Sequence, residues 1–129
     1  MASRVVHFEI PYDDGDRARA FYGDVFGWTI DHWADMGYTM VQTGPVDESG
    51  YATEPGYIGG GMMERQEPVA SPVLTIGVAD IAAALASIEA NGGATVRAGE
   101  PVGEMGFAAY FTDSEGNLLG LWQSAQPTA

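Results

Sequence analysis

The sequence of 129 residues contains no cysteine and no lysine. Without cysteine the chain forms no disulfide, no thiolate zinc site and no cysteine nucleophile, which fits a reducing compartment. Without lysine it offers neither a Schiff base nor the lysine of a phosphate-binding P-loop. These chemistries are therefore excluded as functions of the chain.

Long apolar runs are missing as well. No stretch approaches the length of a membrane span, and the start MASRVVHF lacks the apolar run and the cleavage pattern of a signal peptide. We therefore expect a cytoplasmic protein with no membrane partner.

Positive charge is scarce, because five arginines stand against 18 acidic residues and the formal net charge is −13. A chain this acidic repels phosphate backbones, so nucleic acid is not expected as a partner. The acidity would steer cationic ligands towards the protein, although an acidic solvated surface is the simpler explanation. With 46% hydrophobic residues, the chain is long enough and apolar enough to form a single domain over residues 1–129.

The stretch Arg4–Trp28 predicts a strand followed by a helix. Alternation places Val5, His7 and Glu9 on one face of the strand and an apolar set on the other. Acidic residues at 13, 14 and 16 predict the start of the helix, and Gly27 predicts its end. The helix carries an apolar stripe that we expect in the core: Ala18, Phe21, Tyr22, Val25 and Phe26.

The same order recurs 66 residues later. Asp80 repeats Asp14 as the N-cap, Gly93 repeats Gly27 as the stop, and a second apolar stripe lies between them. The second stripe consists of Ile81, Ala84, Leu85 and Ile88. Further strands are expected at 28–33, 38–43, 57–64, 72–78, 95–96, 107–112 and 117–123, with surface loops at 44–56 and 100–106. The sequence thus predicts a module at about 4–64, a linker at 65–71, a second module at about 72–123 and a tail at 124–129.

The duplicated β-α-β-β-β order, with FY and FGW around the first helix, VAD and NGG around the second, and the terminal TDSEGNLLGLW, resembles the vicinal-oxygen-chelate superfamily. The relatives include glyoxalase I, bleomycin-resistance proteins and extradiol dioxygenases. The resemblance implies an α+β fold in which two tandem βαβββ modules form a curved, cup-like mixed β-sheet with flanking helices. It also implies a ligand or metal site enclosed by the two cups, and it makes a homodimer the expected assembly.

Metal-dependent relatives take up to four ligands from the first and fourth strands of each module. Carried over by position, this resemblance puts one ligand on His7 and the others on Val73, on Gly120 and within Gly59–Gly61. Only His7 has a donor side chain, and a catalytic divalent ion needs about three protein donors. We therefore expect no metal cofactor, with an ion held by His7 and Glu9 as the disfavoured alternative.

The alternation that puts Val5, His7 and Glu9 on one face of the first strand also defines the expected ligand pocket. His7 and Glu9 are its candidate catalytic residues. The glycines would leave room for a ligand, and Trp122 would stack on it together with Trp33, Tyr57 or Tyr110. The pocket residues are Val5, His7, Glu9, Gly59, Gly60, Gly61, Val73, Thr75, Leu118, Gly120 and Trp122. His32, near the first hairpin turn, is expected to be a surface residue.

The resulting hypothesis is a metal-free, glyoxalase-like protein that binds a small aromatic or cationic molecule, as bleomycin-resistance proteins do. Two alternatives stay open at this point. One is a lyase, isomerase or dioxygenase, with a metal or with Glu9 or His7 as base. The other is a structural or regulatory dimer with a filled pocket.

Overall fold

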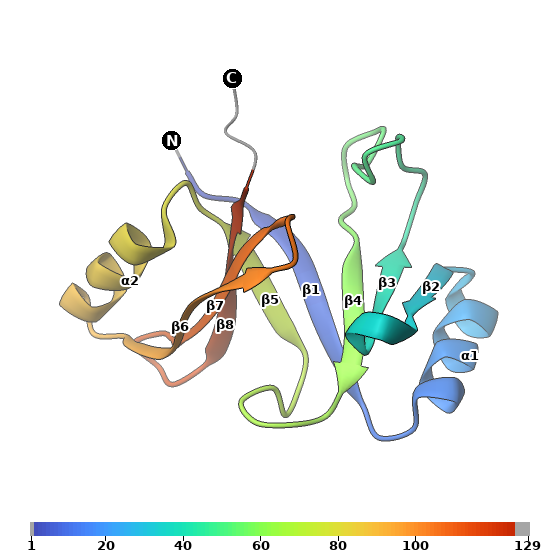
Figure 1. Ribbon diagram of the computed structural model, residues 1–129, viewed down its shortest axis with the longest axis horizontal. Helices are drawn as coiled ribbons and strands as arrows, with labels where there is room; N and C mark the ends of the chain where they lie inside the picture. Colours follow the sequence, from blue (N-terminus) through green and yellow to red (C-terminus); the bar gives the residue numbers. More distant parts are fainter. Residues whose placement is uncertain (1, 126–129) are drawn as a thin grey trace. The chain divides into compact units, whose positions relative to one another are not determined.

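The computed structural model describes residues 2–125, and its contacts divide the chain into two compact units (Figure 1). The first unit comprises residues 7–72, and the second comprises residues 2–6 and 73–125. Each unit holds one α-helix and four strands, with β1 beginning in the second unit and continuing through the first. Of the tail predicted at 124–129, residues 126–129 lie outside the described part of the chain.

In the first unit the strands lie in the order β2-β3-β4-β1. Their bounds are β1 Val5–Tyr12, β2 Thr29–Trp33, β3 Tyr38–Gln42 and β4 Gly60–Glu64, with a short 3-10 helix, η1, at Ala34–Met36. β1 runs parallel to β4, whereas β2–β3 and β3–β4 are antiparallel. The predicted hairpin and the predicted strand rich in glycine are thereby confirmed.

Helix α1, Gly15–Phe26, begins and ends where its sequence predicts. The Asp14 carboxylate accepts a hydrogen bond from the backbone N–H of Arg17, which is the N-cap contact that satisfies a free donor of the first turn. Gly27 ends the helix with a φ of 70°, a left-handed conformation that glycine adopts without strain.

The prediction that the apolar stripe of α1 is core is wrong for three of its five members. Phe21, Val25 and Phe26 are each more than half exposed, and no residue of the helix is fully buried. Tyr22 instead stacks on Trp28, with ring centroids 5.1 Å apart and an interplanar angle of 7°. Periodicity identified an apolar face correctly but overestimated how much of it the sheet covers.

In the second unit the strands lie in the order β5-β8-β7-β6. Their bounds are β5 Val73–Gly77, β6 Ala94–Val102, β7 Gly106–Thr112 and β8 Leu118–Ser124, and α2 spans Ile81–Ala90. β5 runs parallel to β8, and β8–β7 and β7–β6 are antiparallel. The backbone N–H of Gly77 donates to the carbonyl of Arg4 at 2.9 Å, which attaches the start of the chain to β5.

Helix α2 covers one face of this second set of strands. Its Asp80 N-cap accepts from the N–H of Ala83, and its predicted apolar stripe packs into a core, as expected. The buried members of that core are Ile81, Leu85, Ala109, Phe111 and Leu121.

Strand β6 differs from its prediction. A short strand and a loop were expected, but β6 continues to Val102, with register irregularities on either side of Arg97. Pro101, which favours a loop, is tolerated because β6 is an edge strand that has a neighbour on one side only.

The segment expected as a linker packs on the first unit. Val69 within it is fully buried, and the Arg65 guanidinium binds the Asp13 carboxylate at 2.9 Å and the carbonyl of Ala70 at 2.5 Å. The α+β class and the two βαβββ modules are confirmed. No helix among residues 2–125 has the length and apolarity needed to cross a membrane.

Candidate functional site

His7 and Glu9 lie on the face of the first unit's strands opposite α1. Their neighbour Phe8 points to the helix side, where its ring lies 5.7 Å from that of Trp28. Because side chains alternate along a strand, His7 and Glu9 point to the other face. We call this surface the helix-free face of the first unit.

The hydroxyl of Tyr38 joins these two residues. Tyr38 is the first residue of β3, and its oxygen lies 2.8 Å from Nε2 of His7 and 3.3 Å from Oε2 of Glu9. Residues two apart on a strand are separated by about 6.6 Å, so the sequence does not guarantee a direct hydrogen bond between them and allows a bridging water. The bridge in the structure is a tyrosine, so His7, Tyr38 and Glu9 form one polar chain.

Burial lowers the pKa of the His7 imidazole from 6.5 to about 4, since the charged form loses hydration. His7 is therefore neutral at pH 7. A neutral imidazole has one N–H donor and one lone pair, so it donates a hydrogen bond from one ring nitrogen and accepts one at the other.

The glycines of β4 do not leave empty space, contrary to the sequence interpretation. A Cβ atom on Gly61 would collide with the Tyr38 ring, and one on Gly60 would collide with the Phe8 ring. Gly60 and Gly61 therefore accommodate aromatic neighbours, and Gly61 is what allows Tyr38 to reach His7. Gly59 precedes β4, where an added Cβ would lie 3.0 Å from the carbonyl oxygen of Val41.

Gly120 has the same role in the second unit. It pairs with Thr75, and a Cβ on Gly120 would lie 2.9 Å from the Thr75 hydroxyl. Gly61 pairs with Glu9 across the corresponding parallel strands of the first unit. Glu9 and Thr75 are 66 positions apart, so the duplicated units share a glycine opposite the same strand position.

The other predicted pocket residues lie in the second unit, on the strand face that alternation predicts for them. Leu119 and Leu121 of β8 face α2, and Ile76 of β5 does so too, which places their sequence neighbours on the opposite, helix-free face of that unit. Those neighbours are Thr75, Leu118, Gly120 and Trp122, and Val73 lies on the same face as Thr75. Val73 and Thr75 are buried there, whereas Val5, at the start of β1, is largely exposed.

Of the aromatic residues proposed to stack with Trp122, Tyr110 is on a neighbouring strand. It pairs with Gly120 across β7 and β8, and the Arg97 guanidinium lies 5.9 Å from its ring centroid. Trp33 donates its Nε1–H to Asp31 in the first unit. The Tyr57 hydroxyl donates to the carbonyl of Pro45, which holds the ring against the loop at 44–56.

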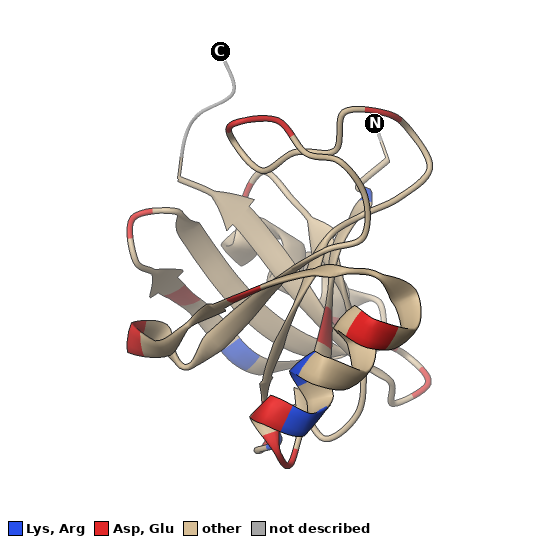
Figure 2. Cartoon of the chain, turned by 90° about the vertical axis from the view of Figure 1, so that its right-hand side faces the viewer, with Lys and Arg blue, Asp and Glu red and all other residues tan. Residues whose placement is uncertain are grey.

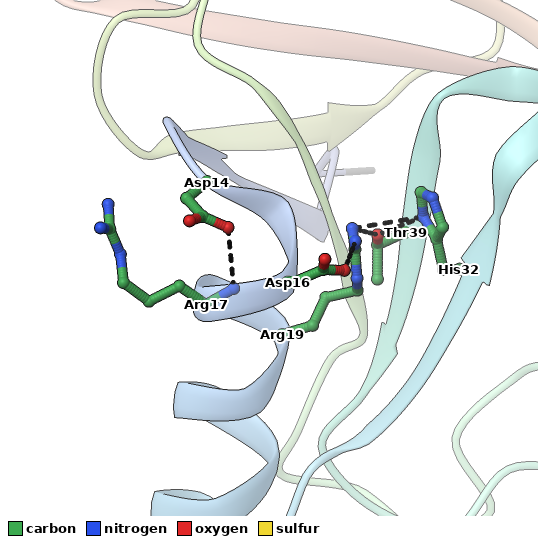
Figure 3. Close-up of polar contacts among 6 residues, drawn as sticks. All are labelled: Asp14, Asp16, Arg17, Arg19, His32 and Thr39. Atoms are coloured by element: carbon green, nitrogen blue, oxygen red, sulfur yellow. Dashed lines mark hydrogen bonds and ion pairs between the residues drawn. The ribbon is translucent and has the colours of Figure 1, made fainter.

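His32 is a surface residue, as predicted, but it takes part in a polar cluster that the sequence did not indicate (Figure 3). Its Nδ1 lies 2.9 Å from the Thr39 hydroxyl and 3.4 Å from the Arg19 guanidinium. Arg19 also donates to Thr39 at 3.3 Å and to Asp16 at 2.8 Å. The cluster attaches α1 to the β2–β3 hairpin, so its first role is structural.

The described residues around His7 offer few donors for a metal ion. No three histidine, aspartate or glutamate side chains within residues 2–125 come close enough to hold one ion. Near His7 the second donor is a tyrosine hydroxyl that is already bridging to Glu9. The donors match a hydrogen-bonding site better than the ligand set of a divalent cation.

A hollow of about 300 Å³ in the second unit contains none of the predicted pocket residues. It lies on the helix side, and its polar groups are engaged, since the Ile81 N–H donates to the side-chain oxygen of Gln123. Its lining comprises Asp80, Ile81, Ala82, Leu85, Ala98, Gly99, Phe107 and Gln123. Nothing in this lining converges on a ligand, so we locate the candidate site at His7 instead.

Acidic residues outnumber basic residues in the chain. In Figure 2, where α1 faces the viewer, acidic residues lie on the helix and on several loops, and the helix also carries two arginines, Arg17 and Arg19. The resulting field favours cationic over anionic small molecules.

Residues 4–44 match the family model described as bleomycin resistance protein-like N-terminal. His7, Glu9 and Tyr38 all lie inside this matched segment. No curated protein matches the chain.

Solved structures match over nearly the whole chain. A variant of the Streptomyces coelicolor methylmalonyl-CoA epimerase, in complex with 2-nitronate-propionyl-CoA, aligns with a TM-score of 0.67 and 19% identity, covering 100% of this chain and 99% of that one. The Mycobacterium tuberculosis methylmalonyl-CoA epimerase aligns with a TM-score of 0.64 and 18% identity, covering 98% and 93%. A hypothetical protein of Bacillus halodurans gives 0.66 and 13%, covering 100% and 99%. At these identities the likeness confirms the fold.

Proposed function

We propose that this chain, which has the fold of the vicinal-oxygen-chelate superfamily, binds a small cationic or aromatic molecule at the helix-free face of its first unit, without a metal. The observation that carries the proposal is the chain of hydrogen bonds from His7 through Tyr38 to Glu9. Convergent polar groups of this kind are typical of the orienting groups of a small-molecule site.

The similarity of residues 4–44 to the N-terminal part of bleomycin resistance proteins supports binding as the function. Binding needs a complementary surface and no reacting group. The Glu9 carboxylate and the net charge of −13 favour a cation as the ligand. We further propose that the working form is a cytoplasmic homodimer.

The test is calorimetric titration of protein stripped of metals with EDTA. The probes are bleomycin and ethidium as cationic aromatic compounds, and benzoate as an anionic aromatic control. We expect at least one cation to bind and Glu9→Gln to weaken it about tenfold or more, while Tyr51→Phe, at an exposed site, leaves binding unchanged. Binding of neither cation, or binding that Glu9→Gln does not alter, would contradict the proposal.

A second candidate is metal-free proton transfer, because the same hydrogen bonds connect an imidazole to a carboxylate. The structural neighbours include methylmalonyl-CoA epimerases, which makes methylmalonyl-CoA the obvious probe. The phosphates of coenzyme A would meet a strongly acidic protein here, which argues against such a substrate. Deuterium uptake into methylmalonyl-CoA from D₂O, catalysed by the metal-stripped protein and lost in Glu9→Gln, would favour this candidate over simple binding.

A further inference from the structure

The hydrogen bonds of Tyr38 fix the direction of the whole polar chain. A tyrosine hydroxyl has one proton, and an ionised carboxylate only accepts hydrogen bonds. Tyr38 therefore donates to Glu9, over 3.3 Å. The contact of 2.8 Å between the Tyr38 oxygen and Nε2 of His7 is then a hydrogen bond only if His7 donates.

This direction selects one tautomer of His7. The neutral ring has a single N–H, and Tyr38 places it on Nε2, so Nδ1 carries the lone pair. Burial disfavours the doubly protonated ring at neutral pH, as described above. Tyr38 and Glu9 thus determine which atom of His7 is available to a ligand.

Nδ1 of His7 makes no hydrogen bond to any residue in the described part of the chain. It is also not sealed off, because no side-chain nitrogen or oxygen among residues 2–125 is both buried and without a partner. The atom is therefore an acceptor that the described residues do not completely enclose, located on the same face as a carboxylate.

We infer that Nδ1 of His7 is the atom that receives the ligand, and that the ligand presents an N–H donor to it, carried on a protonated amine or amidine. The inference rests on the proposed function and narrows its ligand class from cations in general to cations that donate hydrogen bonds. A quaternary ammonium ion has the charge without the donor, and a carboxylate has neither. We expect both classes to bind more weakly. Nδ1 of His7 would lose its hydrogen bond with water and gain none from a carboxylate oxygen or from the methyl groups of a quaternary ammonium ion.

The tautomer is measured without any ligand, by two-bond ¹H–¹⁵N correlation spectra of the imidazole rings at pH 7. His32→Gln leaves a single ring in the spectrum, since the sequence has two histidines. We expect the pattern of a ring protonated on Nε2, and we expect Tyr38→Phe to shift it towards a mixture of tautomers. A ring protonated on Nδ1, or on both nitrogens, overturns the inference.

The ligand class is measured with two matched cations, benzylamine and benzyltrimethylammonium, which differ in whether the nitrogen carries hydrogen. We expect benzylamine to bind about tenfold more tightly, and His7→Phe to remove that difference. Equal affinities would overturn the donor inference while leaving cation binding intact. If neither benzylamine nor benzyltrimethylammonium nor bleomycin bound, the result would instead contradict the proposed function, whichever tautomer His7 adopts.

Discussion

Arg19 occupies in α1 the position that Leu85 occupies in α2, 66 residues further along the duplicated sequence. Leu85 is buried in an apolar core, whereas Arg19 extends its guanidinium to Thr39, His32 and Asp16. Gly15, at the position of Ile81, leaves the space, because a Cβ there would lie 2.8 Å from the guanidinium. The equivalent helices are therefore attached to their strands by different interactions. Apolar packing attaches α2, and hydrogen bonds of Arg19 attach α1.

Arg19→Ala should lower the free energy of unfolding by about 1–2 kcal/mol, because the fully buried Thr39 loses a hydrogen-bond donor. Asp16→Asn should change it by less than about 0.5 kcal/mol, since the Asp16 carboxylate is 99% exposed. Urea unfolding followed by circular dichroism measures both. Arg17→Ala is the matched control, because only the backbone N–H of Arg17 makes a hydrogen bond in Figure 3. Equal losses for Arg17 and Arg19 would contradict the role of the cluster.

Leu85→Ala should destabilise the protein by about 2–5 kcal/mol, the range for truncating a large side chain in a packed core. Val25→Ala on α1 should change stability by less than about 0.5 kcal/mol, because that side chain is 57% exposed. The same unfolding measurement compares the two. A loss at Val25 as large as that at Leu85 would mean that the apolar face of α1 is covered in solution.

Tyr38→Phe should lower stability by about 1–2 kcal/mol, because His7 and Glu9 both lose the partner that joins them. The ring itself remains, so packing against Gly61 is retained. Tyr51→Phe removes a hydroxyl from a side chain that is 68% exposed and should change stability by less than about 0.5 kcal/mol. If the two variants unfolded at the same urea concentration, the bridge would contribute nothing.

Stability should fall as the pH is lowered from about 6.5 to about 4, because His7 takes up its proton more readily in the unfolded chain than in the folded one. The folded pKa is the lower one, so the contribution of His7 is complete above the unfolded pKa of 6.5. It is lost progressively down to about pH 4, amounting to about 3 kcal/mol at most. Thermal or urea unfolding across this range measures the slope. His7→Gln should flatten it, and His32→Gln should leave the His7 contribution in place.

Gly61→Ala should destabilise the protein by about 1–3 kcal/mol, because the added methyl group collides with the ring of Tyr38. Gly23→Ala should have the opposite effect on stability. Gly23 lies inside α1, an added Cβ would be 3.7 Å from the nearest atom, and alanine forms helices better than glycine. We expect it to raise stability by about 0.4–1 kcal/mol. A destabilising Gly23→Ala or a neutral Gly61→Ala would show that these contacts are absent in solution.

The sequence predicted the helices well because their signals are local. Asp14, Asp80 and Gly27 act on atoms within one helical turn, so the bounds of α1 and α2 follow from them. The pattern could not show how much of α1 is covered, since burial of Phe21 and Phe26 depends on the strands that face them. The length of β6 was underestimated for a similar reason, because pairing with β7 outweighs the local preference of Pro101.

Only part of the candidate site could be predicted from the sequence. Alternation placed His7 and Glu9 on one face, but Tyr38 comes from another strand, and no sequence spacing connects it to them. The signal that was available lay in Gly61, since a glycine inside a strand indicates a close approach by another group. The sequence interpretation assigns that approach to a ligand, whereas the group that fills the space is the ring of Tyr38.

The contact between Gly61 and Tyr38 also bears on how such a chain changes over evolutionary time. The resemblance to metal-dependent relatives puts a coordinating side chain within Gly59–Gly61, and here any side chain at 61 meets the ring of Tyr38. Gly61 therefore cannot be exchanged for a coordinating residue without a collision while Tyr38 is in place. Replacing Tyr38 with a smaller residue would remove the collision, and it would also remove the bridge between His7 and Glu9. A side chain at 61 and the ring of Tyr38 thus compete for the same space, so that each of two chemistries on one fold excludes the other.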